Sequence, residues 1–275
     1  MPRLIRAALD AAGVPDAGRI SSGVDVVGDI AIVRLTGFTS REKLKVASAI
    51  LGELKNVKVV MEQQGGITGE FRLRKLKHLA GERRTLTVHR ENGCAFRVDV
   101  ARCYFSPRLS TERLRVAQHV RKRERVLNMF AGVGPYSIPI AKLAGARVTS
   151  CELNELAAKL HEENNRMNRV ERLVEVVQAD AAELPTLVEG RFDRVIMPLP
   201  SEADRFLPVA LELAKKGGTI HYYRHMLGEN DGEAAEALTA ELEALLPKRS
   251  RYEVRRVRAV GPRWLEMAAD IRAPG

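Results

Sequence analysis

The sequence predicts an α/β protein in which a doubly wound, mostly parallel sheet follows a smaller α+β domain. The apolar run 126–130 leads into the turn Gly132-Val133-Gly134 and then into a helix that begins near Pro135. A strand, a glycine turn and a helix in this order form the first βα unit of a nucleotide- or nucleoside-binding sheet. Two later strand signals end in acidic residues, Glu152 and Asp180. Before residue 108, by contrast, short alternating strands accompany one clear helix.

The first part of the chain is predicted to form two segments. Residues 1–22 comprise a short helix, 4–12, and a linker. Residues 23–107 comprise the α+β domain. Its expected elements are one bulged or two short strands in 24–35, a helix over 40–54 capped by Ser40, a β-branched run at 57–61, a flexible loop at 64–69, and strands at 83–90 and 94–100. Between the last two strands, Asn92-Gly93 accepts the positive φ angles of a tight hairpin turn.

Residues 108–275 are predicted to form the larger, Rossmann-like domain. Ser106-Pro107 ends the preceding strand, and a helix follows over 109–120. Further strands are expected at 146–151, 173–178, 194–197 and 219–223, and further helices at 155–168, 202–215 and 231–246. Two late strands, 252–260 and 264–271, are joined by Gly261-Pro262 and add an antiparallel hairpin to the sheet.

The acidic strand ends favour S-adenosylmethionine as the cofactor. Glu152 can accept hydrogen bonds from two ribose hydroxyls, and both dinucleotide enzymes and S-adenosylmethionine enzymes use such a residue. A dinucleotide site requires a third glycine for helix packing, and Ser137 stands at that position. Asp180 can hold an adenine amino group. A glycine turn alone is equally consistent with ordinary turn geometry, but the two carboxylates together favour the class I S-adenosylmethionine-dependent methyltransferase fold.

Positive charge is concentrated before the glycine turn. Residues 1–125 contain 25 Lys and Arg against 13 Asp and Glu, whereas residues 126–275 contain 20 against 22. This asymmetry predicts an RNA- or DNA-binding first domain joined to a neutral catalytic one. The alternative is the solvated surface of an arginine-rich protein. The residues expected to contact nucleic acid are Arg72, Arg74, Lys75, Lys77, Arg83, Arg84, Arg108 and Arg113.

Composition also argues against several other classes. No run of eighteen apolar residues and no signal peptide is present, so we expect a cytoplasmic protein without a membrane segment. The three cysteines, Cys94, Cys103 and Cys151, form no CxxC motif and are expected to be reduced. The six histidines lack the spacing of metal ligands, so no metal site is predicted. We expect a monomer.

Several motifs together resemble those of the archaeal and eukaryotic tRNA (guanine-N1)-methyltransferases, which modify the guanosine 3′ of the anticodon, position 37. The resemblance extends over nearly the whole chain from about Val24. The motifs are Gly69-Glu70-Phe71-Arg72-Leu73-Arg74, Glu91-Asn92-Gly93, Tyr104-Phe105-Ser106-Pro107-Arg108-Leu109, Met129-Phe130-Ala131-Gly132-Val133-Gly134-Pro135 and Ile220-His221-Tyr222-Tyr223.

The resemblance implies roles for individual residues. Glu112 resembles the general base that removes the proton from guanine N1, and Arg72 the arginine that stabilises the resulting charge on O6. Tyr104 resembles part of the cofactor pocket. The residues expected to bind S-adenosylmethionine are Tyr104, Asn128, Phe130, Gly132, Gly134, Glu152, Leu153, Asp180, Ala181 and Pro198.

Three features depart from the family pattern. Asn128 stands where the family usually has Asp, which weakens one carboxylate near the methionine amine. Pro198-Leu199-Pro200 replaces Asn-Leu-Pro, so the side-chain amide of that asparagine is lost. Many relatives also carry a further small N-terminal domain that contacts the tRNA elbow; the chain begins too late to include one, so tRNA recognition is expected to be less global.

Three alternatives to this function remain open at the sequence level. One is the related wybutosine-pathway enzyme that transfers an aminocarboxypropyl group from the same cofactor. A second is methylation of a tricyclic wyosine precursor by a bifunctional relative. A third, of a different class, is a non-catalytic RNA-binding protein; Pro198 favours it, whereas the retained Arg72 and Glu112 oppose it.

Overall fold

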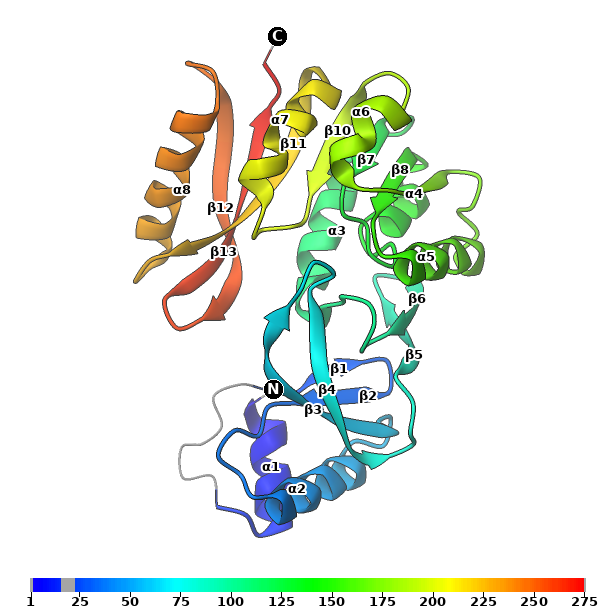
Figure 1. Ribbon diagram of the computed structural model, residues 1–275, viewed down its shortest axis with the longest axis vertical. Coiled ribbons are helices and arrows are strands. Elements are labelled where there is room, and N and C mark those ends of the chain that lie inside the picture. The colour runs from blue at the N-terminus through cyan, green and yellow to red at the C-terminus, as the bar shows by residue number, and fades with distance from the viewer. Residues whose placement is uncertain (1, 16–22, 275) are drawn as a thin grey trace.

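The computed structural model describes residues 2–15 and 23–274. Figure 1 shows a small sheet with two helices at the N-terminal end and a large sheet flanked by helices at the C-terminal end. The small sheet has the order β1-β2-β3-β4, and the large one has the order β12-β13-β11-β10-β7-β8-β9. The α/β fold class predicted from the sequence, with a Rossmann-like sheet preceded by smaller α+β structure, is therefore confirmed.

The small sheet packs against two helices. Its strands are β1 (Asp25–Val27), β2 (Ile30–Val33), β3 (Val59–Thr68) and β4 (Leu73–Gly81), and its helices are α1 (Pro2–Ala12) and α2 (Ser40–Glu53). Leu9, Ile50 and Val60 are among the buried residues of the core between them. Helix α2 is capped by Thr39, one residue before the predicted Ser40. Thr39 and Glu42 form a reciprocal capping box, which satisfies two backbone donors at once.

The segment 64–69, predicted to be a flexible loop, instead belongs to a β-hairpin. Strand β3 continues to Thr68 and pairs with β4 through Ile67–Arg74 and Thr68–Leu73. A register shift accommodates the two glycines, and Gly65 adopts φ +75° there. The prediction was wrong because the β-branched pair Ile67-Thr68 resumes the ladder beyond the bulge. Arg72 is consequently carried on a paired hairpin that projects toward the large sheet (Figure 1).

A second hairpin connects the two parts of the molecule. Strands β5 (Leu86–Glu91) and β6 (Cys94–Asp99) turn at Asn92-Gly93, both with positive φ, as predicted. Strand β6 is held by Asn164 of helix α5 (Glu155–Met167) and by Asn168, the C-cap residue of that helix. Arg97 N donates to Asn164 Oδ1 at 2.7 Å, and Ala95 N donates to Asn168 Oδ1 at 2.9 Å. The hairpin thus contacts the larger domain, although the predicted domain division at 107/108 assigns it to the first. The domain boundary at 107/108 remains a prediction.

The large sheet is parallel from β9 to β11 and is extended by an antiparallel hairpin. Its strands are β7 (Arg125–Asn128), β8 (Arg147–Glu152), β9 (Val174–Gln178), β10 (Phe192–Met197), β11 (Ala214–Leu227), β12 (Arg251–Gly261) and β13 (Trp264–Arg272). The remaining helices are η1 (Pro107–Leu109), α3 (Ser110–His119), α4 (Ser137–Ala144), η2 (Ala181–Glu183), α6 (Leu184–Leu187), α7 (Ala203–Leu213) and α8 (Asp231–Leu245). Strand order reverses at β7, and ligands bind at the carboxyl ends of the strands beside such a reversal.

Strand β11 is much longer than the predicted 219–223. It pairs with β13 over nine residues, from Thr219–Arg272 to Leu227–Trp264. The late hairpin therefore extends well beyond the parallel strands and descends beside the β3–β4 hairpin (Figure 1). Among residues 2–15 and 23–274, no helix is long and apolar enough to cross a bilayer. All three cysteines are buried and unbridged.

Candidate active site

A cleft of about 1050 Å³ lies between the two parts of the molecule. Its walls come from the glycine turn after β7, the carboxyl ends of β8 to β10, the tip of the β3–β4 hairpin and the tip of the β12–β13 hairpin. The predicted residues that line it are Arg72, Arg74, Tyr104, Arg108, Arg113, Phe130, Gly132, Glu152, Leu153, Asp180, Ala181 and Pro198. Most of the predicted cofactor residues are thus brought together.

Glu152 is held at the centre of this wall by backbone donors. Its Oε2 accepts from Gly132 N at 2.6 Å, and its Oε1 accepts from Asn154 N at 2.8 Å. Burial raises the pKa of Glu152, and these backbone hydrogen bonds oppose the shift. Gly132, with φ +54°, brings the glycine turn against the carboxylate. A fixed acceptor beside a backbone turn that lines the cleft is suited to a ribose.

Asp180 and an apolar surface complete the same pocket. Asp180 follows β9, and its Oδ1 accepts from Ala182 N at 2.9 Å, which orients the carboxylate. Phe130 packs edge-on against Phe206, with ring centroids 4.9 Å apart. Flat apolar side chains next to a carboxylate acceptor fit an adenine ring with its amino group. The donor and acceptor set therefore fits S-adenosylmethionine.

Two predicted cofactor residues lie outside the cleft lining. Asn128 is fully buried and donates from Nδ2 to Ser137 Oγ at 3.0 Å, while its Oδ1 has no hydrogen-bond partner within residues 2–15 and 23–274. Gly134 has φ +93°, and a Cβ there would lie 2.5 Å from the Cδ2 atom of His161. The positions of these residues do not support cofactor contact, because both face the packing of α4 and α5 behind the glycine turn.

Replacing Gly134 by alanine should destabilise the fold by roughly 2–4 kcal/mol, since a methyl group would overlap His161 in a fully packed site and would also be strained at positive φ. Gly145→Ala is the matched control, with φ +63° but open space within 4 Å of the added Cβ. It should cost only about 1 kcal/mol. Urea unfolding measures both; equal losses would show that the His161 contact is unimportant.

Arg72 lies at the tip of the β3–β4 hairpin and bridges the cleft. It adopts φ +52°, an unusual conformation for a residue with a Cβ. Its Nη1 donates to Ser201 Oγ at 2.6 Å, and its guanidinium carbon lies 5.9 Å from the centroid of the Tyr104 ring. The contact with Ser201 joins residues 129 positions apart. The guanidinium is therefore presented to the cleft where the small sheet meets the large one.

Glu112, the predicted base, does not line the cleft. It is buried at the first turn of α3 and accepts hydrogen bonds from Arg115, Arg255 and the Tyr223 hydroxyl, at 3.0, 2.5 and 2.5 Å. Burial alone would raise the pKa of Glu112, but these hydrogen bonds outweigh it and hold the pKa below its ordinary value. The carboxylate is therefore ionised at neutral pH.

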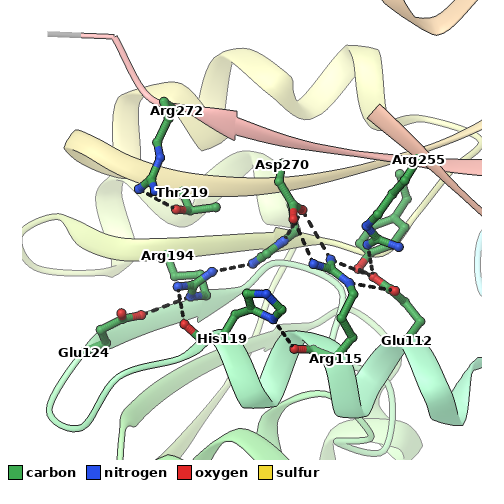
Figure 2. Close-up of polar contacts among 11 residues, drawn as sticks. Glu112, Arg115, His119, Glu124, Arg194, Thr219, Arg255, Asp270 and Arg272 are labelled. Carbon is green, nitrogen blue, oxygen red and sulfur yellow. Dashed lines mark hydrogen bonds and ion pairs between the residues drawn. The ribbon is translucent and has the colours of Figure 1, made fainter. Parts of the chain in front are cut away.

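A line of alternating charges extends from Glu112 across the sheet (Figure 2). Arg115 also contacts Asp270, at 2.9 Å, and Asp270 accepts from His221 Nδ1 at 2.6 Å. His221 Nε2 lies 2.7 Å from Arg194 Nη1, so Nε2 accepts and Nδ1 carries the proton. Burial is the main cause that lowers the pKa of His221, so the ring is neutral. This network holds Arg115, and through it Glu112, in one orientation.

Two tyrosines connect Glu112 to the cleft. Tyr136 lines the cleft, and its ring centroid lies 6.1 Å from that of Tyr223, whose hydroxyl donates to Glu112. The two rings are tilted by 53° to one another, and burial raises the pKa of both hydroxyls. Both phenols are therefore protonated at neutral pH. We call this pair, which lies between the cleft and a buried carboxylate, the tyrosine path.

The predicted nucleic-acid-contacting residues fall into two groups. Arg74 and Arg113 are buried in ion pairs: Arg74 contacts Asp25 at 3.1 Å, and Arg113 contacts both oxygens of Glu91 at 2.6 Å. Their positions do not support phosphate binding, because those carboxylates already neutralise them. Arg84 is likewise paired, with Asp29. The side chains that remain exposed are Lys75, Lys77, Arg83 and Arg108, although Arg108 also contacts Asp25.

Several cleft residues were not predicted from the sequence. Arg258 and Glu266 form a pair at 2.6 Å on facing positions of β12 and β13, and both line the cleft. His225 lines it too, and burial together with Arg72 and Arg258 lowers its pKa to about 4. Strand alternation within 252–271 could have placed Arg258 and Glu266 on one face. That this face lies near the glycine turn could not be predicted from the sequence.

Comparison with known proteins identifies the family. Residues 87–246 match the TRM5/TYW2 methyltransferase domain, and residues 5–85 match the TYW2 N-terminal domain. The chain belongs to the TRM5/TYW2 methyltransferase family. Among relatives of this family, the tRNA (guanine(37)-N(1))-methyltransferase Trm5b of Pyrococcus abyssi is 38% identical over 92% of this chain and 75% of the relative. The tRNA 4-demethylwyosine(37)-methyltransferase Taw21 of Saccharolobus solfataricus is 34% identical over 91% of this chain and 93% of the relative.

Solved structures of the TRM5/TYW2 family have the same fold. The complex of aTrm5 with tRNALeu superposes with a TM-score of 0.82 at 35% identity, over 94% of this chain and 73% of that one. Methanocaldococcus jannaschii Trm5 in complex with adenosine gives a TM-score of 0.78 at 33% identity, over 94% and 74%. The resemblance inferred from the motifs is confirmed.

Proposed function

We propose that this TRM5/TYW2 family member transfers a methyl group from S-adenosylmethionine to N1 of guanosine 37 in tRNA. The observation that carries the proposal is the cleft itself, which places the Gly132 turn, Glu152 and Asp180 opposite the Arg72 guanidinium. The guanosine methyltransferase Trm5b and the tRNA-bound aTrm5 support the substrate. We further propose that one copy of the chain binds the anticodon region, in the cytoplasm.

The cofactor site is formed by the large sheet. Glu152 would hold the ribose hydroxyls, Asp180 the adenine amino group, and Phe130 and Leu153 the apolar surface of the ring. When bound, S-adenosylmethionine supplies an electrophilic methyl group on a sulfonium. Tyr104 lies between this pocket and Arg72, where it can separate the cofactor from solvent and orient the incoming base.

The chain's own residues manage the proton and the charge of the target base. Guanine N1 must lose its proton before its electron pair can attack the methyl carbon, and the negative charge then spreads to O6. Arg72 is placed to stabilise that oxygen. We propose that three protons move together. The N1 proton passes to the Tyr136 oxygen, the Tyr136 hydroxyl proton passes to the Tyr223 oxygen, and the Tyr223 hydroxyl proton passes to the Glu112 carboxylate. The N1–C bond forms as the S–C bond breaks, leaving a neutral sulfide.

Mass spectrometry of tRNA nucleosides tests the function directly. After incubation with labelled cofactor, guanosine should gain one methyl group. A gain of one aminocarboxypropyl group would instead assign the chain to the wybutosine transferase activity, and no gain would favour a non-catalytic RNA-binding protein. A parallel reaction on tRNA carrying the tricyclic 4-demethylwyosine base tests the second candidate, methylation of that base. The similarity to Taw21 motivates this arm.

Replacing Glu152 with glutamine should weaken S-adenosylmethionine binding about 10- to 100-fold, because a charged hydrogen-bond acceptor is lost while the side-chain shape remains. Affinity for tRNA should change little. Calorimetry with S-adenosylmethionine and S-adenosylhomocysteine measures the effect, and Glu175→Gln, an exposed carboxylate on β9, is the matched control. Binding of a nicotinamide dinucleotide by the parent protein, without binding of these ligands, would contradict the cofactor assignment.

A further inference from the structure

An exposed apolar patch continues the wall of the cleft at the end of the β12–β13 hairpin. It consists of Leu227, Val260 and Trp264, which are 49, 40 and 45% exposed. Leu227 and Trp264 are cross-strand partners, and Val260 is the bulged residue next to Gly261, which pairs with Trp264. Isolated exposed apolar residues are ordinary, but an adjoining group at the mouth of a cleft indicates a binding surface. We call these three residues the hairpin patch.

Strand alternation places the hairpin patch on the cleft side of the sheet. Residues two apart on a strand share a face, so Trp264 lies on the face of Glu266, and Leu227 on that of His225. Glu266 and His225 both line the cleft, as does Val260. Trp264 is therefore the next side chain beyond Glu266 on the same wall of the cleft.

The opposite side of the cleft mouth is also aromatic. Phe71, at the β3–β4 turn next to Arg72, is 42% exposed and lines the cleft. Arg72 lines the cleft next to Phe71, and its guanidinium donates to the uncharged Ser201 hydroxyl, whereas Arg205 and Arg258 are paired with Glu202 and Glu266. Exposed aromatic faces combined with guanidinium groups are the features that bind single-stranded nucleic acid, by stacking on bases and by contacts to phosphates. The positive charge of Arg72 beside these aromatic faces favours RNA over a protein as the occupant.

We propose that the hairpin patch, centred on Trp264, stacks on an unpaired nucleotide that flanks the target base in the RNA loop. This inference rests on the proposed function. A base drawn out of its stack into the cleft leaves a neighbouring base without a stacking partner. The indole replaces that partner and so holds the loop while the target base is in the cleft. Trp264 is a positioning residue, because it contacts RNA at a distance from the reacting atoms.

Fluorescence offers a direct test, since Trp264 is the only tryptophan in the sequence. Addition of a guanosine-37 anticodon stem-loop to the protein with S-adenosylhomocysteine should quench the indole emission. Stem-loops in which each nucleotide flanking guanosine 37 is made abasic in turn identify the stacked base. Removal of that base should abolish the quenching, whereas removal of the other should not.

Binding and kinetics of Trp264→Ala provide an independent measure. The dissociation constant for the stem-loop should rise about 5- to 100-fold, the range found when a stacking aromatic is removed. The single-turnover rate at saturating RNA should stay near that of the parent, and Trp264→Phe should retain most of the affinity. Leu143→Ala, which truncates another exposed apolar side chain, on α4, is the control. The stem-loop that lacks the stacked base should bind to Trp264→Ala and to the parent with the same affinity, because neither complex contains the stacking contact.

Two outcomes would overturn the stacking proposal. One is unchanged emission together with parent-like RNA affinity in Trp264→Ala. The other is a change in self-association or protein binding without a change in RNA affinity, which would make the hairpin patch a protein interface. If the parent protein transferred no methyl group, the proposed function would be contradicted. Nucleoside analysis measures methyl transfer independently of the fluorescence experiment.

Discussion

Replacing Arg72 with alanine should slow methyl transfer to guanosine about 100- to 1000-fold at saturating tRNA and cofactor, because a preorganised donor to the developing O6 charge is lost. The transfer rate of Arg72→Lys should lie between those of the parent and of Arg72→Ala. Lysine keeps the charge, but it cannot reproduce the planar fork of donors. All three residues carry a Cβ and meet the same penalty at φ +52°, so the series isolates the guanidinium.

Single-turnover rates are the appropriate measurement for the Arg72 series, because slow product release can hide a change in chemistry. Ser201→Ala removes the hydroxyl that Arg72 contacts, and it should have a much smaller effect on the rate. Lys75→Ala, on the same hairpin but exposed, should weaken RNA binding without slowing the saturated reaction. A normal rate in Arg72→Ala would show that the guanidinium only joins the hairpin to the large sheet.

Replacing Glu112 with glutamine should both slow the transfer step and destabilise the protein by roughly 3 kcal/mol, since Arg115 and Arg255 would lose a buried charged partner. The pKa of Glu112 is lower in the folded state than the ordinary value of 4.5. Its ionised form therefore stabilises the fold above that pH, and the contribution is lost as the pH falls through the folded pKa. The stability difference between parent and Glu112→Gln should thus be largest near neutral pH and shrink in acid.

The tyrosine path separates a catalytic role of Glu112 from a structural one. Tyr136→Phe keeps both arginine contacts of Glu112 but removes the hydroxyl of the tyrosine that lines the cleft. If the proton reaches Glu112 through the tyrosines, this variant should slow single-turnover transfer without a large loss of stability. A different outcome would make Glu266 the proton acceptor. In that case Tyr136→Phe and the folded fraction of Glu112→Gln would transfer the methyl group at the parent rate, whereas Glu266→Gln would transfer it slowly.

Local sequence determined the fold of the large sheet and the cofactor side of the cleft. The run before Gly132 is apolar enough for a buried strand; Glu152 is the last residue of β8, and Asp180 lies two residues after the end of β9. Parallel strands present their carboxyl ends at one edge, so the order of elements along the chain was sufficient to bring these side chains together. The Asn92-Gly93 hairpin was equally predictable, because its φ angles depend on those two residues alone.

Only the tertiary structure decided the orientation and the partners of the other site residues. Asn128 and Gly134 stand in the expected motif, yet packing against α4 and α5 turns them away from the cleft. Arg72 meets Ser201, and Glu112 meets Tyr223 and Arg255, across separations of 111 to 143 residues. Spacing along a chain sets which neighbours share a face of a helix or strand. It carries no information about which distant surface that face will meet, because the choice depends on how whole elements pack.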